Sequence, residues 1–174
     1  MTVLDIRDLS LSIGQTPILK NVSLSIAPGE ILGLVGESGS GKSMTALAVL
    51  GLTPPRAAVT GEIRLNGQLI SGASDAALQK VRGRDVGIIF QEPMTALNPV
   101  MTIGDQVAET VRLHKGASRK EALAVARAVL DRVGLPAERF PLSRFPHELS
   151  GGQRQRVAIA IAIALTPRLL IAAE

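Results

Sequence analysis

The chain contains no cysteine, no tryptophan and no tyrosine, and phenylalanine occurs only 3 times in 174 residues. Without cysteine there is no disulfide framework and no thiolate metal site, which is compatible with a reducing cytosol. Few aromatic residues, together with basic residues that are scattered rather than clustered, argue against a surface that stacks nucleic-acid bases. We therefore expect no nucleic-acid partner.

Long apolar runs are also missing. None approaches the ~20 residues that span a bilayer, and the first residues, Met1 to Asp8, interleave charged and apolar side chains, unlike a signal peptide. We therefore expect any membrane role to come through a partner. A hydrophobic content of 46% is enough to build a core, and the net charge of +4 suits phosphate ligands.

The most informative segment runs from Gly36 to Ser43 and matches the complete pattern G-x-x-x-x-G-K-[ST]. Its glycines allow backbone N–H groups to converge on a phosphate at a helix N-terminus, whose dipole favours anions. The flanks fit, because Glu30–Val35 is predicted to be a buried strand and Lys42–Leu50 a helix. The pattern thus predicts an ATP site that consists of Gly36, Glu37, Ser38, Gly39, Ser40, Gly41, Lys42 and Ser43. Lys42 is expected to reach the β and γ phosphates, and Ser43 to bind Mg²⁺.

Alternation of apolar and polar residues predicts an antiparallel β layer before this loop. Val3–Ile13 and Ile18–Ile26 read as two strands around a turn, and Gly61–Leu69 reads as a hairpin around Asn66-Gly67. Val86–Phe90 is a short apolar run, which predicts a buried strand that delivers Gln91 at its end.

The pattern then becomes helical. Helices are predicted over Ile103–Leu113 and, with Ser118 as N-cap and Glu121 three residues later, over Arg119–Val133. Val157–Leu165 alternates large and small residues with the period of a strand, yet we predict a helix because alanine is the best helix former and a poor strand former. The small residues are then expected to face a closely packed sheet. Leu169–Ala173 is predicted to be a strand.

A second glycine motif, Leu-Ser-Gly-Gly-Gln, occupies Leu149–Gln153. Together with the phosphate loop, Gln91 and the Leu169–Glu174 segment, it resembles the motif set of the ATP-binding subunits of ABC transporters, in the same order and spacing. The stretches Phe90–Pro99 and Phe145–Val157 resemble those of dipeptide, oligopeptide and nickel importers. The resemblance covers essentially the whole chain.

This resemblance implies a function and a set of partners. The protein is expected to be a cytoplasmic subunit, peripheral on the inner face of the cell membrane, that pairs with a second ABC ATPase subunit as a homo- or heterodimer. It would couple ATP binding and hydrolysis to uptake of peptides or similar small solutes through permease subunits, fed indirectly by an extracytoplasmic solute-binding protein.

The resemblance also implies roles for individual residues. Ser150, Gly151, Gly152 and Gln153 would contact the γ-phosphate of ATP held by the facing subunit. Gln91 would sense the γ-phosphate and Mg²⁺, and the residues just after it would touch the permease. Glu174 would activate the attacking water as the general base.

Three features depart from the family pattern. Ala173 stands where an aspartate helps to hold Mg²⁺, and a methyl group cannot bind a hard cation. The hairpin that usually supplies an aromatic ring to adenine offers Ile13. The chain also ends after the strand that leads to Glu174, so we expect the C-terminal part of the core, including the family's switch histidine, to be missing.

The expected fold is α/β: a phosphate-loop NTPase core of ABC type with an N-terminal antiparallel β layer and an inserted helical subdomain. We assign residues 1–101 and 165–174 to the core and 102–164 to the helical subdomain. One alternative remains open for function, namely a hydrolysis-deficient nucleotide-binding fragment with a structural or regulatory role, or none. A DNA-repair or chromosome ATPase is less consistent, since neither heptad arms nor zinc-ligand cysteines occur.

Overall fold

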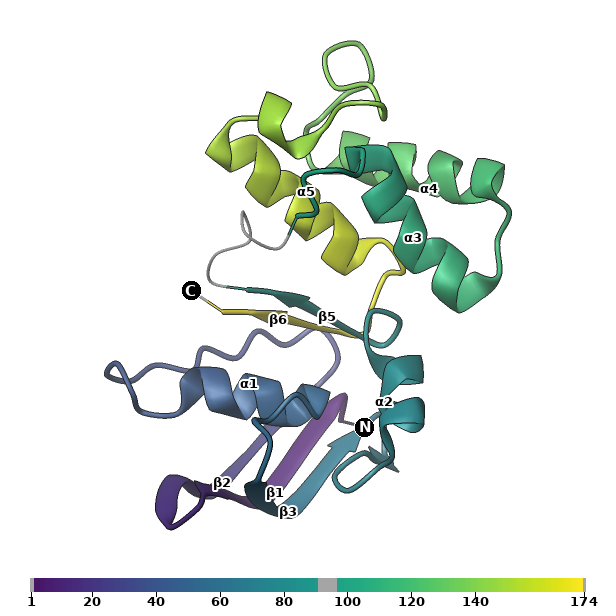
Figure 1. Ribbon diagram of the computed structural model, residues 1–174. Helices are drawn as coiled ribbons and strands as arrows, with labels where there is room; N and C mark the ends of the chain where they lie inside the picture. The colour runs from purple at the N-terminus through teal and green to yellow at the C-terminus, as the bar shows by residue number, and fades with distance from the viewer. Residues whose placement is uncertain (1, 91–96, 174) are drawn as a thin grey trace. The chain divides into compact units, whose positions relative to one another are not determined.

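The computed structural model describes residues 2–90 and 97–173, and the chain divides after Arg82 into two compact units, which we describe separately (Figure 1). This division falls earlier in the chain than the predicted start of the helical subdomain at residue 102.

The first unit contains an antiparallel sheet of four strands in the order β2-β1-β3-β4. The strands are β1 (Leu4–Ile13), β2 (Thr16–Ile26), β3 (Ala57–Leu65) and β4 (Gln68–Leu69). Both predicted turns are confirmed: β1 pairs with β2 around Gly14, and β3 pairs with β4 around Asn66-Gly67. The N-terminal antiparallel layer expected from the sequence is therefore present.

The core of this sheet follows from the alternation along its strands. Ile6 in β1 lies opposite Ile63 in β3, and each is only 1% exposed. Leu11 lies five residues further along β1, beyond a shift in the strand register, and is equally buried. Burial of such side chains contributes roughly 1.5–3 kcal/mol each, so this row of aliphatic contacts holds β1 between its neighbours.

Two helices belong to the first unit, α1 (Lys42–Leu50) and α2 (Asp75–Val81). The bounds of α1 agree with the prediction. Helix α2 was not predicted, although its entry carries a recognisable signal: the Ser74 hydroxyl accepts a hydrogen bond from the Ala77 amide, and Asp75 lies in the first turn. A serine cap in a seven-residue helix is a weak signal beside the longer apolar patterns that surround it.

The strand predicted over Glu30–Val35 is not formed, which corrects the sequence analysis. Ile31 and Val35 are 97% and 94% exposed, and within the described residues no strand pairs with this segment. A fully apolar strand needs hydrogen-bonded neighbours at its edges and covered faces. Apolarity alone predicted the strand, whereas its formation depends on partners that the described chain does not place beside it.

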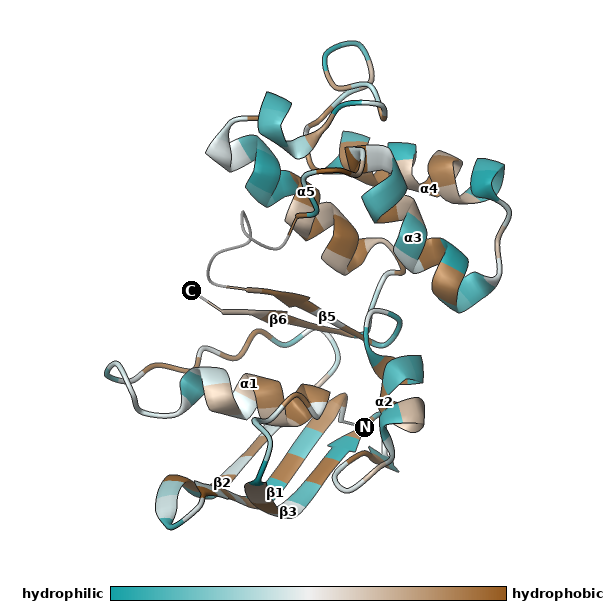
Figure 2. Ribbon diagram, viewed as in Figure 1, coloured by the Kyte–Doolittle hydropathy of each residue, from teal (hydrophilic) through white to brown (hydrophobic). Residues whose placement is uncertain are grey.

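In its described residues, the second unit combines two parallel strands with three α-helices and one short 3₁₀ helix. Its elements are β5 (Val86–Ile89), α3 (Ile103–Lys115), α4 (Arg119–Arg132), the short 3₁₀ helix η1 (Pro146–Glu148), α5 (Gly151–Ile163) and β6 (Leu169–Ala172). The strands pair in register from Val86 opposite Leu169 to Ile89 opposite Ala172. Figure 2 shows both strands hydrophobic along their length, as expected for parallel strands, which are normally covered on both faces.

Helices α3, α4 and α5 pack on one another around a shared aliphatic core (Figure 1). Ile103, Val107 and Val111 lie on one face of α3 at helical spacing and are at most 1% exposed, and Leu130 of α4 and Val157 of α5 are fully buried. The predicted helices over 103–113 and 119–133 are confirmed. The capping box of α4 is also present, with Ser118 and Glu121 bonded reciprocally.

The period-two stretch is a helix, as predicted, but its small residues do not all face the sheet, because Ala160 belongs to the core that α5 shares with α3 and α4. Ala160 and Ala162 are buried, and α5 packs on β5. A Cβ atom on Gly87 of β5 would collide with the carbonyl oxygen of Ala162. Glycine in the strand thus allows the backbones of α5 and β5 to approach closely, which a larger residue at position 87 would prevent.

Candidate functional site

The phosphate loop leads directly into helix α1. Gly41 is the N-cap of this helix and has a φ of 92°, a left-handed conformation that favours glycine. No side chain caps the helix, and the first backbone bond is donated by Thr45 to the carbonyl of Gly41 at 2.8 Å. The amide groups of the first turn therefore point out of the helix end, where the helix dipole favours a negative ligand.

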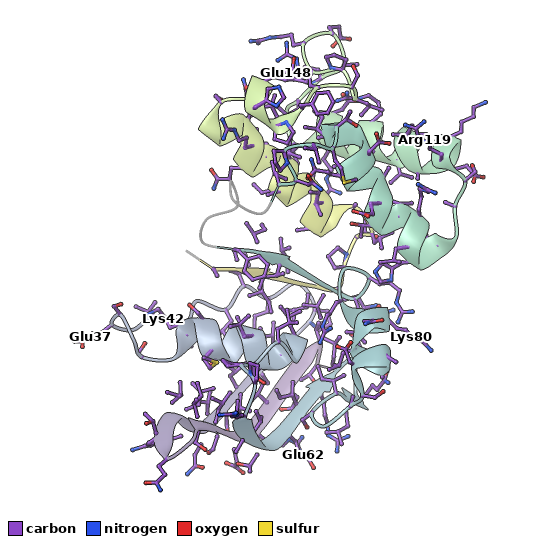
Figure 3. All side chains as sticks on the ribbon, viewed as in Figure 1. Glu37, Lys42, Glu62, Lys80, Arg119 and Glu148 are labelled. Atoms are coloured by element: carbon purple, nitrogen blue, oxygen red, sulfur yellow. The ribbon has the colours of Figure 1, made fainter. Side chains whose placement is uncertain are left out.

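Lys42 is held at the centre of this loop. Its Nζ donates hydrogen bonds of 2.7 Å to the carbonyl oxygens of Gly36 and Glu37, and it lies 3.4 Å from the Ser40 hydroxyl. In Figure 3, Lys42 lies at the start of α1 and Glu37 in the loop before it. A cation that spans both ends of a glycine-rich turn has the charge and position to bind phosphate oxygens.

The loop offers few ligands for a metal ion. Ser43 lies exposed in the first turn of α1, where its hydroxyl is accessible. Among the described residues, no group of three or more histidine, aspartate or glutamate side chains could hold a metal ion. Mg²⁺ commonly keeps several waters and binds through one or two protein oxygens plus substrate phosphates, so Ser43 fits an ion that nucleotide phosphates bring with them.

The second glycine motif forms the start of α5. Ser150 is the N-cap: its Oγ accepts a bond of 3.4 Å from the Gln153 amide, while the Gln153 side chain accepts a bond of 2.9 Å from the Ser150 amide. Gln153 is thus part of a capping box, which fixes the entry of the helix. The hydroxyl proton of Ser150 remains available to donate to a ligand, because the capping bond uses only a lone pair of its oxygen.

Gly152 lies in the first turn of α5 in open space. Apart from its chain neighbours and the backbone of its own helix, no heavy atom lies within 4 Å of the position that its Cβ would occupy, and the residue is exposed. Nothing within the described structure therefore requires glycine at this position. The backbone at Gly152 is therefore open to close approach by another molecule.

An open pocket of about 300 Å³ adjoins this helix start. Arg139 and Arg156 give it positive charge, and Arg139 lies over the ring of Phe140, 5.7 Å from the ring centre. The pocket is lined by Gly134, Leu135, Arg139, Phe140, Ser150, Gly152, Gln153 and Arg156. A polar, positively charged depression next to exposed backbone amides suits an anion.

The two predicted catalytic residues, Gln91 and Glu174, lie outside the described residues. The strands that lead to them are described: β5 and β6 run parallel and in register, and the Ala173 amide donates a bond of 2.9 Å to the Ile89 carbonyl. The carboxyl ends of parallel neighbours meet at one edge of a sheet, which is where ligands bind in such folds. Ala173 places a methyl group at this edge.

Two well-bonded residues were missed by the sequence analysis. Arg82 donates hydrogen bonds to the carbonyls of Leu50 and Gly51 at the end of α1. Gln106 is a buried polar residue on α3, 7% exposed, and bonds to the loop before that helix. For Gln106 a signal existed, because the residue lies on the apolar stripe of α3, three positions after Ile103, where a polar side chain needs a partner.

In the part of the chain that the structure describes, no helix has the length and apolar character of a membrane-spanning segment.

Comparison with known proteins places these motifs in a family. The model of the family described as "ABC transporter" matches residues 19–174. The glutathione import ATP-binding protein GsiA of Salmonella typhimurium is 53% identical over 167 residues, which are 92% of this chain and 27% of that protein. A putative peptide import ATP-binding protein of Brucella melitensis biotype 1 is 47% identical over 163 residues, 90% of this chain and 48% of the relative. The chain therefore spans less than half the length of these curated relatives.

Solved structures agree with the fold. The dimeric ATP-binding cassette MJ0796, bound to ADP and phosphate, matches with a TM-score of 0.83 and 32% identity over 97% of this chain and 72% of that chain. CbiO1 from Clostridium perfringens, part of the ABC transporter complex cbiONQ, matches with a TM-score of 0.80 and 26% identity, covering 98% and 64% of the two chains. The α/β fold of ABC type predicted from the sequence is confirmed. The resemblance drawn from the phosphate loop and the second glycine motif is confirmed with it, and this chain belongs to the ABC transporter family of ATP-binding proteins.

Proposed function

We propose that this protein binds Mg²⁺ and ATP as the nucleotide-binding part of an importer that takes up peptides or similar small solutes, such as glutathione. The position of the Lys42 ammonium group carries this proposal, since it lies 2.7 Å from two carbonyls of a loop that ends at an uncapped helix N-terminus. That arrangement supports binding of a polyphosphate. The names of the relatives, which refer to glutathione and peptide import, support the class of solute.

Within this proposal, the two glycine motifs act on different nucleotides. Gly36 to Ser43 bind the phosphates and, through Ser43, Mg²⁺. Ser150, Gly151, Gly152 and Gln153 contact the γ-phosphate bound by a facing subunit, so that ATP joins two such chains. The open space at Gly152 supports such an approach, and the dimeric state of MJ0796 is consistent with it.

The remaining roles follow the family pattern. Gln91 senses the γ-phosphate and Mg²⁺, and Glu174 acts as the general base for hydrolysis. The protein would work at the cytoplasmic face of the membrane, bound to permease subunits, with a solute-binding protein outside. The description of CbiO1 as part of an ABC transporter complex is consistent with a membrane assembly.

One observation favours a second candidate, a nucleotide-binding protein that does not hydrolyse ATP. Ala173 follows β6 at the sheet edge beside Ile89, and its methyl side chain cannot bind or orient Mg²⁺ or its waters. In this candidate, ATP binding joins subunits or regulates a partner, and the reaction is carried out by the second subunit of a heterodimer.

The test is a titration of the purified protein with ATP, with and without Mg²⁺, using Lys42→Ala. We expect saturable binding that Lys42→Ala abolishes and that Mg²⁺ strengthens, because Ser43 and the phosphates would share the ion. Lys20→Ala is the matched control, since Lys20 is an exposed lysine on β2, outside the loop. Loss of binding in both variants, or in neither, would contradict the assignment of the loop as the nucleotide site.

Hydrolysis distinguishes the two candidates. Under the first candidate function, the complex of this protein with the permease releases phosphate from ATP, and Glu174→Gln stops this release while ATP still binds. Under the second, ATP binds and no phosphate is released, and Ala173→Asp creates or raises hydrolysis by supplying the missing oxygen ligand.

A further inference from the structure

Arg156 on α5 contacts the end of another helix. Its Nη1 donates hydrogen bonds to the backbone carbonyls of Val133 and Gly134, at 3.4 and 3.3 Å. Val133 is the C-cap of α4, and Gly134 follows it directly. The last carbonyls of a helix carry partial negative charge and lack partners within the helix, so a cation there is favourable. A side chain of α5 therefore closes the C-terminal end of α4.

Gly134 has the backbone geometry that this contact needs. Its φ of 78° is left-handed, and a Cβ atom at this position would lie 2.6 Å from Nη1 of Arg156, which is too close for a real side chain. Gly116 ends α3 in the same conformation, with a φ of 60°, but apart from its chain neighbours no atom lies within 4 Å of its Cβ position. The turn alone explains glycine at position 116, whereas at position 134 the space is also needed by Arg156.

The segment that Arg156 binds is fixed from the other side by Arg127 of α4. Nη1 of Arg127 donates a bond of 2.8 Å to the Phe140 carbonyl, and Nη2 donates to the Leu135 carbonyl. The side chains of Leu135 and Phe140 are themselves buried. Residues 134–140 are thus held on α4, and Arg156 ties α5 to a well-anchored segment.

The same contact borders the pocket beside the start of α5. Arg156 and Gly134 line this pocket together with Ser150 and Gly152. Ser150 is the N-cap of α5 and lies less than about two turns before Arg156. Because the hydrogen-bonded helix joins the two residues, the contact of Arg156 with α4 also sets the position of Ser150 relative to the opposite wall of the pocket.

We propose that Arg156 is a positioning residue for the association of two subunits: by binding the end of α4 it holds the start of α5 in the place from which Ser150 and Gly152 reach the facing nucleotide. This inference rests on the proposed function, in which the second glycine motif contacts ATP held by a facing subunit. Arg156 acts through the placement of α5, so it affects association and leaves the phosphate loop unchanged.

The experiment measures two quantities in the full protein: the affinity for a non-hydrolysable ATP analogue with Mg²⁺, and the association of two chains that this analogue induces, by analytical ultracentrifugation. Arg156→Gln removes the charge and both bonds to the end of α4. We expect it to weaken association about tenfold, while the affinity for the analogue stays within about twofold. Arg132→Gln is the matched control, because Arg132 is exposed in the last turn of α4. It removes a cation from the same helix end, keeps the Arg156 contact and should leave both quantities unchanged.

A pair of glycine variants separates positioning from stability. Gly134→Ala places a methyl group where the flexible end of Arg156 lies and displaces it. Gly116→Ala has the same cost of a left-handed alanine and displaces nothing. Thermal unfolding should show similar losses of stability in the two variants, whereas only Gly134→Ala should weaken association, about as much as Arg156→Gln. Equal association in the two glycine variants would overturn the proposal.

Hydrogen exchange tests whether Arg156 acts through α5 or touches the facing subunit itself. Without nucleotide, the Gln153 amide, which donates to the Ser150 hydroxyl, is expected to exchange about fivefold faster in Arg156→Gln than in wild type, while amides within α3 remain protected. Weaker association with unchanged exchange at Gln153 would overturn the positioning role, since the arginine would then contribute by direct contact.

The inference and the proposed function can fail separately. If the wild-type protein binds the analogue but two chains do not associate, the proposed role of the second glycine motif is wrong and the inference falls with it. If wild type associates and both Arg156→Gln and Gly134→Ala associate equally well, only the inference is wrong.

Discussion

The Nε of Arg82 donates a hydrogen bond of 2.8 Å to the carbonyl oxygen of Leu50, the last residue of helix α1. A second nitrogen, Nη2, donates to the Gly51 carbonyl at 3.1 Å, and Nη1 pairs with Asp75 at 2.8 Å. A cation at a helix C-terminus satisfies unpaired carbonyls and complements the negative end of the helix dipole. Arg82 therefore stabilises one end of the helix whose other end carries the phosphate loop.

Replacement of Arg82 by alanine is expected to destabilise the protein by about 1–3 kcal/mol, because two backbone carbonyls lose their partners. The free energy of unfolding in urea measures this change. Arg84→Ala is the control: Arg84 pairs with its neighbour Asp85 and its side chain is 52% exposed, so its loss is expected to change stability by no more than about 1 kcal/mol. An equal decrease in the free energy of unfolding in the two variants would show that the end of α1 does not depend on Arg82.

Two glycine substitutions are expected to differ in their effect on stability. Gly87→Ala places a Cβ against the Ala162 carbonyl and within 3.1 Å of Leu170, so overpacking should destabilise the protein by about 1–3 kcal/mol. Gly152→Ala has no atom to meet within 4 Å and is expected to leave stability unchanged. If another subunit approaches Gly152 closely, this variant should nevertheless weaken ATP-dependent association of two chains, measured by analytical ultracentrifugation. Stable dimers of Gly152→Ala would contradict that contact.

The acid sensitivity of the helical region should depend on Asp105. A hydrogen bond from the Thr102 hydroxyl, followed by one from Arg119, lowers the pKa of Asp105 below its usual range. Because the folded-state pKa is lowered, the stabilisation is fully present above the usual aspartate pKa of about 4 and is lost as pH falls through the lower folded-state value.

Asp105→Asn should therefore show a smaller loss of stability on acidification than wild type, measured by thermal unfolding over this pH range. Glu109→Gln, an exposed position on the same helix, serves as control. A variant that loses as much stability as wild type would show that other carboxylates dominate the acid response.

The segment 30–35 is expected to promote self-association of the 174-residue chain. Ile31 and Val35 are almost fully exposed, and exposed apolar segments of high β propensity pair with other chains. Ile31→Lys with Val35→Lys should lower light scattering at a given protein concentration. Leu113 lies at an isolated position on α3 and is 78% exposed, so Leu113→Lys should lower light scattering less. A larger decrease in Leu113→Lys than in the double variant would contradict this role of segment 30–35.

The sequence was most informative where one local pattern decides the outcome. The Ser118–Glu121 capping box, the Asn66-Gly67 turn and the bounds of α1 are all local, and all were predicted correctly. The helix over Val157–Leu165 was predicted from the helix propensity of alanine, although the alternation of large and small residues there has the period of a strand. That period does not mark one packed face, because alternate residues of a helix point to nearly opposite sides: Ala160 lies in the core of the three helices, whereas the Ala162 carbonyl lies against Gly87.

The predictions failed where the outcome depends on distant residues. The strand over Glu30–Val35 needs neighbours that no local pattern supplies, and the contacts of Gln106 and Arg82 join the side chain of one element to the backbone of another. For the candidate site, the motifs located the phosphate loop and the helix start at Ser150. They could not show that the side chain of Gln153 is bonded back to Ser150.

That last contact has a consequence for the kinetics of assembly. Because Ser150 and Gln153 already hold each other, the start of α5 has its final shape before any partner arrives. A preformed surface of this kind needs no rearrangement on encounter. In the proposed dimer, association of two subunits around ATP should therefore approach the rate of rigid docking, and differences in affinity should appear in the dissociation rate.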